Sequence, residues 1–161
     1  MKQTLLAALL CAIFQLCAAQ DDYYFRHYQV ENGLSHNTVM CSVQDEQGFL
    51  WLGTKDGLNR FDGTSFKVFR YDEEDSTTLG NNYVRCLYKD PSGRLFAGTQ
   101  RGLFRYYPRT ETFSHIPSSG SKSIKEISSD GRGNLWFITE GVLTQLQEKT
   151  GRVKTFPADK N

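Results

Sequence analysis

The sequence predicts an all-β fold made of consecutive four-stranded antiparallel units, and two observations carry that prediction. One sixteen-residue pattern occurs three times, at residues 39–54, 84–99 and 124–139. Each copy places a tight-turn signal between two short apolar runs, which is the pattern of two strands joined by a hairpin. A repeat of about 40–45 residues with this content is typical of β-propeller blades. We therefore expect three blades of an incomplete propeller.

The three copies share a set of fixed positions. Their anchor aspartates lie 45 and 40 residues apart, and each is followed by Gly, Leu, an aromatic residue and Thr at constant spacing. The repeated positions expected to be structural are Asp45, Gly48, Trp51, Gly53, Thr54, Asp90, Gly93, Phe96, Gly98, Thr99, Asp130, Gly133, Trp136 and Thr139. Asp at a turn bonds its own backbone and Gly accepts positive φ, so we expect turn formers and no metal or cofactor. The two tryptophans are expected in the core between blades.

Residues 1–19 are predicted to be a signal peptide. A lysine at position 2 precedes an apolar run over 5–14, and small residues precede a cut between Ala19 and Gln20. The apolar run is too short for a stable membrane span, which disfavours an uncleaved anchor. Lipid attachment at Cys17 is disfavoured by the bulky residues before it. The remaining chain is thus expected to be exported.

The elements then follow in chain order. Residues 20–38 precede the first blade, and their aromatic, β-prone run over 23–30 predicts a strand. Blade 1 is predicted over 39–78, blade 2 over 79–120 and blade 3 over 121–161, joined by polar linkers. In blade 1 the expected strands are 39–43, 49–53, 58–61 and 66–69. In blade 3, Ile138 and Val142 stand where the other copies have Gly, so its middle corner is expected to be reshaped around Gly141.

Cys41 and Cys86 occupy the same position in two successive repeats. We expect both to be small buried hydrophobes. An exported protein permits a disulfide between them, but equivalent points on neighbouring blades are usually too far apart for one.

Charge and composition exclude several functions. The net charge is +1, so no nucleic acid is expected to bind this segment. The histidines are scattered over three elements, and no carboxylate pair or triad is evident. The chain as it stands is therefore expected to be non-catalytic.

Three stretches carry a resemblance to a known family. They are Gly33-Leu-Ser-His-Asn-Thr-Val39, Asp45-x-x-Gly48-Phe-Leu-Trp-Leu-Gly-Thr54 and Gly57-Leu-Asn-Arg-Phe-Asp-Gly63. With them the chain resembles the two-component regulator propeller repeat over about residues 23–157, the third copy least faithfully. The resemblance implies the periplasmic sensor region of a hybrid two-component receptor, with a membrane helix, a histidine kinase and a DNA-binding module beyond it. It also implies sensing of products of complex carbohydrates. No kinase motif is present in this sequence.

The expected ligand site lies on the rim formed by the loops between blades and by the corners between each blade's second and third strands. Its candidates are His36, Asn37, Asp56, Asn82, Tyr83 and Arg101. Amides, a phenol and a guanidinium suit an oligosaccharide with hydroxyl or carboxylate groups. For each residue the competing and favoured interpretation is a structural role in its loop. A propeller enzyme and a lectin-like secreted protein are the alternative functions.

Three blades leave two open faces, whereas a closed ring typically needs four to eight. We therefore expect the N-terminal fragment of a longer protein, with further blades of the same polypeptide as partner. A short chain that assembles into a ring is the alternative. A homodimer is a further expectation for the full-length receptor.

Overall fold

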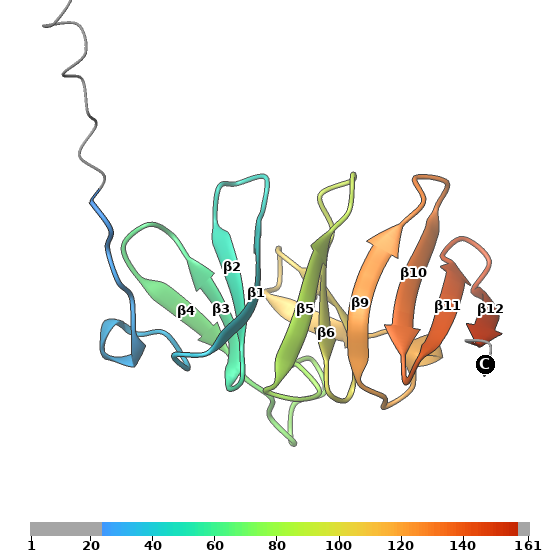
Figure 1. The fold of residues 1–161 in the computed structure, drawn as a ribbon, viewed down its shortest axis with the longest axis horizontal. Helices are drawn as coiled ribbons and strands as arrows, with labels where there is room; N and C mark the ends of the chain where they lie inside the picture. Colours follow the sequence, from blue (N-terminus) through green and yellow to red (C-terminus); the bar gives the residue numbers. More distant parts are fainter. Residues whose placement is uncertain (1–23, 158–161) are drawn as a thin grey trace, which may run out of the picture.

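The computed structural model describes residues 24–157, which form three four-stranded antiparallel sheets standing side by side (Figure 1). The predicted signal peptide and its Ala19–Gln20 junction lie outside the described residues. The all-β prediction of three propeller blades is confirmed, and no sheet is closed on itself. Within the described range, no helix has the length and apolar character needed to cross a membrane.

Each blade is a simple up-and-down sheet in chain order. Blade 1 contains β1 (Val39–Gln44), β2 (Leu50–Thr54), β3 (Gly57–Phe61) and β4 (Phe66–Phe69). Blade 2 contains β5 (Val84–Lys89), β6 (Leu95–Thr99), β7 (Gly102–Tyr107) and β8 (Thr112–His115). Blade 3 contains β9 (Ile124–Ser129), β10 (Asn134–Thr139), β11 (Val142–Gln147) and β12 (Arg152–Pro157). Two short 3-10 turns, η1 (Val30–Asn32) and η2 (Pro117–Ser119), precede blades 1 and 3.

The prediction of a strand over residues 23–30 is wrong. Residues 24–29 pair with no strand, and Val30 begins η1. Tyr28 instead packs edge-on against Phe61 and Phe66, with ring centroids 4.8 and 5.6 Å apart. Aromatic residues favour strands only where a sheet edge can receive them. Of the segment's aromatic residues, Tyr28 packs against blade 1, whereas Tyr24 and Phe25 are exposed.

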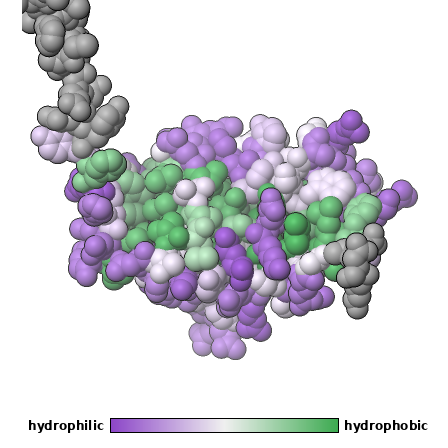
Figure 2. All heavy atoms as spheres, in the orientation of Figure 1, coloured by the Kyte–Doolittle hydropathy of each residue, from purple (hydrophilic) through white to green (hydrophobic). Residues whose placement is uncertain are grey.

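Two joints hold the blades together, and both are apolar. The joint between blades 1 and 2 buries Trp51, Leu58, Leu79, Val84, Leu95, Ala97, Phe104, Tyr106 and Phe113. The joint between blades 2 and 3 buries Phe96, Leu103, Ile124, Ile127, Leu135 and Phe137. Figure 2 shows hydrophobic side chains along the middle of the molecule, with hydrophilic residues along both rims. Packing between neighbouring sheets therefore buries the apolar side chains of both clusters and stabilises the fold.

A glycine hollow lies at the centre of each joint. In blade 1 it is made by Gly53, and a Cβ at this position would lie 2.5 Å from Cys41 Sγ and 2.7 Å from Val84 Cγ1. In blade 2, a Cβ on Gly98 would collide with Cys86 Sγ and lie 2.8 Å from Ile124 Cγ2. Val84 and Ile124, the first residues of β5 and β9, thus occupy space that a side chain on Gly53 or Gly98 would fill.

A backbone clamp accompanies each hollow. The N–H of Gly57 donates to the carbonyl of Asn82 at 2.7 Å, and the N–H of Gly102 donates to the carbonyl of Lys122 at 2.9 Å. Both glycines have positive φ, +125° and +115°. This conformation turns the N–H away from its own hairpin and toward the following blade.

The corner of blade 3 differs, as the sequence predicts. Glu140 and Gly141 have φ values of 49° and 81°. Positive φ at both central positions is the type I′ geometry of a two-residue hairpin. Thr139 and Val142 close this hairpin as a regular pair. The reshaped corner around Gly141 is therefore confirmed.

Cys41 and Cys86 are both free and half-buried. Burial raises the pKa of the Cys41 thiol to about 11 and that of Cys86 to about 12. A thiol reacts as its thiolate, so we expect both to react slowly with a disulfide reagent at pH 8 in the folded chain beginning at Gln20. Rapid reaction of both should appear in denaturant. Equal rates in the folded and unfolded chain would contradict this packing.

Candidate functional site

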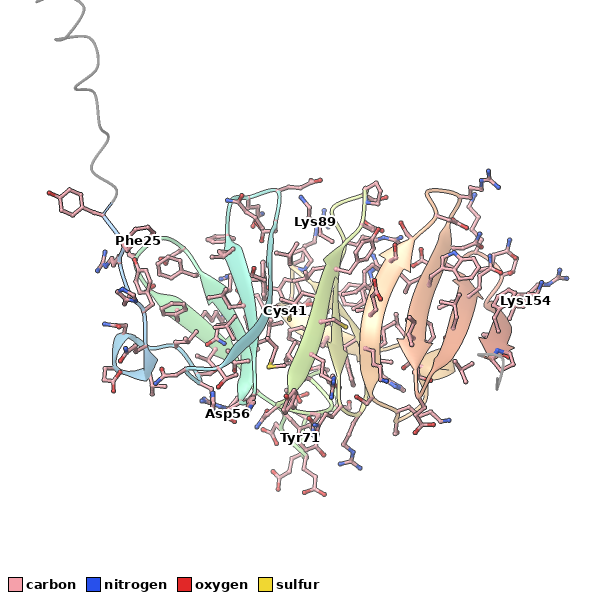
Figure 3. All side chains as sticks on the ribbon, viewed as in Figure 1. Phe25, Cys41, Asp56, Tyr71, Lys89 and Lys154 are labelled. Atoms are coloured by element: carbon pink, nitrogen blue, oxygen red, sulfur yellow. The ribbon has the colours of Figure 1, made fainter. Side chains whose placement is uncertain are left out.

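The six candidate residues lie on one rim of the blades, and the structure joins two of them. Figure 3 places Asp56 and Tyr71 on this rim and Lys89 on the opposite one. Asn82 Nδ2 donates to Asp56 Oδ1 at 3.3 Å across the joint of blades 1 and 2. The other Asp56 oxygen accepts from Arg70 Nη2 at 3.1 Å. Asn82 Oδ1 accepts from the Tyr71 N–H at 2.7 Å. We call Asp56, Arg70 and Asn82 the rim triad.

The other four candidates are spread along the chain's loops. His36 Nδ1 accepts from the Thr38 N–H at 2.8 Å, and Asn37 Oδ1 accepts from the Val30 N–H at 2.9 Å. Both side chains thus brace the loop before blade 1.

Tyr83 and Arg101 lie near the corner of blade 2. The Tyr83 hydroxyl lies 3.7 Å from Met40 Sδ, and the Arg85 guanidinium lies 5.7 Å from the Tyr83 ring centre. Arg101 is exposed, and its backbone N–H donates to Thr99 Oγ1 at 3.0 Å. Tyr83 therefore has side-chain contacts across the joint, whereas the contact of Arg101 is made by its backbone.

Arg70 was missed by the sequence analysis. It directly follows β4, so its position after the last strand of a blade already placed it on the same rim. Nothing in the local sequence showed that its guanidinium would cross to Asp56. That contact follows from the position of the corner before β3 beside the linker after β4.

A pocket on the opposite rim was also missed. It has a volume of about 320 Å³ and lies between the first turns of blades 1 and 2. Trp51, Arg94, Arg105 and Tyr106 are among its lining residues. Arg105 Nε is buried and has no hydrogen-bond partner among residues 24–157. The repeat pattern pointed only to turn formation on this side.

The repeated aspartates on that rim hold their own turns. Asp45 accepts from the N–H groups of Gln47 and Phe49 at 2.9 and 3.0 Å, and from Trp51 Nε1 at 2.7 Å. Asp90 and Asp130 make the corresponding backbone bonds. Across residues 24–157, no three His, Cys, Asp or Glu side chains gather closely enough to hold a metal ion.

Two of these turns also predict the acid stability of the fold. The Asn134 side chain lowers the pKa of Asp130 to about 2. Burial acts to raise the pKa of Asp90, but hydrogen bonds and charge from Arg94 outweigh it, and the net pKa is lowered. Both carboxyls therefore take up protons more readily when unfolded.

Above pH about 5 we expect both groups to contribute their full stabilisation, so that they give the free energy of unfolding no pH dependence there. The free energy of unfolding should fall as the pH drops toward about 2. Urea unfolding at a series of pH values measures this dependence. Asp90→Asn should flatten part of it, since the substituted side chain no longer titrates. A stability that stays constant from pH 5 to pH 2.5 would contradict the role of these turns.

Comparison with known proteins identifies the repeat. Residues 33–56 and 78–101 match the family model described as "Two component regulator propeller". These two segments are two-component regulator propeller repeats. They span the loop, inner hairpin and corner of blades 1 and 2, which confirms the resemblance seen in the sequence. The match leaves out the third copy, whose corner and hollow differ.

Two solved extracellular domains and one curated histidine kinase are similar to this chain. The chain is similar to the extracellular domain of the putative hybrid two component system BT3049 from B. thetaiotaomicron, with a TM-score of 0.74 and 32% identity over 82% of this chain and 20% of that one. For the extracellular domain of BT4673 from the same organism, the TM-score is 0.64 and the identity 26%, over 88% of this chain and 18% of that one. Histidine kinase P4 of Formosa agariphila is 44% identical over 64 residues, 40% of this chain. The chain spans about a fifth of the two solved domains and 5% of the kinase.

Proposed function

We propose that this chain is the ligand-sensing propeller segment of an extracytoplasmic two-component receptor and is non-catalytic in itself. The observation that carries the proposal is the tandem regulator propeller repeat, together with the likeness to the extracellular domain of BT3049. On this proposal the chain is exported to the periplasm. Kinase activity belongs to other parts of such a receptor, and further blades of the same polypeptide cover the open faces.

We propose further that the ligand is a carbohydrate product bound at the rim triad and Tyr83. Asp56 and Asn82 meet across two blades, so a ligand here can report on the joint. The Arg70 side chain is about half exposed and offers a planar donor pair to a hydroxyl or carboxylate. Tyr83, close to the same joint, adds an aromatic face suited to a sugar ring.

Titration calorimetry with neutral and uronate-bearing oligosaccharides tests this proposal on the chain beginning at Gln20. Arg70→Gln should weaken binding about tenfold or more, since a charged hydrogen bond contributes about 1.5–3 kcal/mol. Arg109→Gln is the matched control, because Arg109 is exposed in the β7–β8 turn on the opposite rim. If Arg70→Gln and Arg109→Gln weaken binding equally, the binding site is not at the rim triad. Cleavage of any of the oligosaccharides would contradict the non-catalytic assignment.

A further inference from the structure

Nothing among residues 24–157 packs on the outer face of blade 3. Figure 1 shows β9–β12 at one end of the row of blades. On this face Glu126 and Ser128 are exposed, whereas Trp136, Ile138 and Phe156 are half-buried. The Trp136 and Phe156 rings stack with centroids 5.7 Å apart. The face thus combines these apolar side chains with Gln145 and Lys154, whose ammonium lies 4.8 Å from the Phe156 ring centre, and carries one carboxylate, Glu126, on its inner strand.

The two covered joints show how a following blade is received in this protein. Val84 enters the hollow of Gly53 beside Cys41, and Ile124 enters the hollow of Gly98 beside Cys86. Both are β-branched and fully buried. In both cases a corner glycine donates its N–H to the following blade. Each joint therefore combines a hollow, a small thiol and a backbone clamp.

Blade 3 replaces all three features together. Glu126 pairs with Ile138 in the register in which Cys41 pairs with Gly53 in blade 1. The hollow is thereby filled by a branched side chain, and the thiol gives way to a carboxylate. Val142 stands where the clamp glycines stand, within the regular type I′ hairpin. Blade 3 therefore cannot receive a β-branched residue as blades 1 and 2 do.

Blade 1 begins with Val39, a β-branched residue of the kind that the outer face of blade 3 cannot receive. Val39 occupies the position of Val84 and Ile124, with the partner Thr54 as they have Thr99 and Thr139. Val39 is 43% exposed on the outward face of blade 1, whose outer strands are covered by Tyr28. Placed against blade 3, its branched Cβ would meet Ile138, and its methyl groups would desolvate the Glu126 carboxylate without pairing it. Burying an unpaired charge is costly.

We propose that the outer face of blade 3 binds a propeller blade whose inner strand begins with an unbranched basic residue, Lys or Arg. The linear stem would pass Ile138 without a branch at Cβ, and the terminal cation would pair with Glu126. The stacked Trp136 and Phe156 rings provide an apolar surface against which the rest of the incoming blade packs. The inference depends on how the blades pack and is independent of the proposed sensing role.

Second copies of this chain provide the test, because blade 1 of one copy can be offered to blade 3 of another. All variants carry Tyr28→Ala, since Tyr28 packs on Phe61 and Phe66 of the blade 1 face that must be offered. The chain beginning at Gln20 and its variants are compared by sedimentation velocity in reducing buffer. Wild type should stay monomeric, whereas Val39→Lys should assemble head to tail. High salt should weaken that assembly, and adding Glu126→Gln should abolish it. The double variant Glu126→Cys/Ile138→Gly recreates the hollow of blades 1 and 2 on blade 3. It should therefore assemble by receiving the native Val39 of a second copy.

Folding of each variant is checked by circular dichroism, and Val39→Leu is the matched control for an unbranched but uncharged stem. It should remain monomeric. A folded Val39→Lys chain that stays monomeric overturns the proposal, and so does assembly that persists with Glu126→Gln. Wild-type assembly that Val39→Lys abolishes would also overturn it, because Val39 would then fit the face.

Discussion

Trp51→Ala is expected to lower the free energy of unfolding by about 3–5 kcal/mol. Trp51 is 1% exposed at the joint of blades 1 and 2. Its ring stacks on Phe69 at 5.5 Å and meets the edge of Tyr106 at 4.7 Å, and Nε1 donates to Asp45. Truncation removes this packing from both blades and leaves a cavity between them. Urea denaturation of the chain beginning at Gln20 gives the value directly.

Trp136→Ala is the matched control, since Trp136 has the same place in the third repeat. It is half-buried on the open face of blade 3 and stacks only on Phe156 among aromatic residues of the described chain. We expect a smaller loss, roughly 1–2 kcal/mol, because less apolar surface returns to water. If both substitutions cost the same, Trp51 is not the centre of the first joint.

Gly53→Ile is expected to destabilise the protein by about 1–3 kcal/mol through overpacking, although the third repeat carries Ile at the same position. The new Cβ would fall between Cys41 Sγ and Val84 Cγ1, at 2.5 and 2.7 Å. In blade 3 the same residue pairs with Glu126, and within residues 24–157 no β-branched side chain of a following blade enters beside it. Thermal unfolding measures the loss, and hydrogen exchange of β1 and β5 shows whether the joint opens.

A double-mutant cycle separates the crowded hollow from a simple loss of strand stability. Cys41→Gly removes the closest atom, so it should recover part of the stability lost in Gly53→Ile. Each change is first measured alone. Additive losses in the double variant would show that the thiol and the glycine do not share one space.

Local sequence patterns determined most of the fold. Short apolar runs and Asp-x-x-Gly turns are local features, so they defined three four-stranded blades with boundaries close to those observed. The replacement of two glycines by Ile138 and Val142 likewise predicted the altered corner of blade 3. These features depend on backbone conformation within a few residues, which the sequence encodes directly.

The tertiary structure decided what depends on a neighbour. Residues 24–30 have strand-forming side chains, yet residues 24–29 pair with no strand and Tyr28 packs on blade 1. Arg70 entered the candidate site through a contact with Asp56 that spans fourteen residues of sequence. The repeat predicted the same core role for Trp51 and Trp136, yet within residues 24–157 only Trp51 has a blade packed over it. Burial is a property of the joint between blades, whereas the sequence by itself determined the blades.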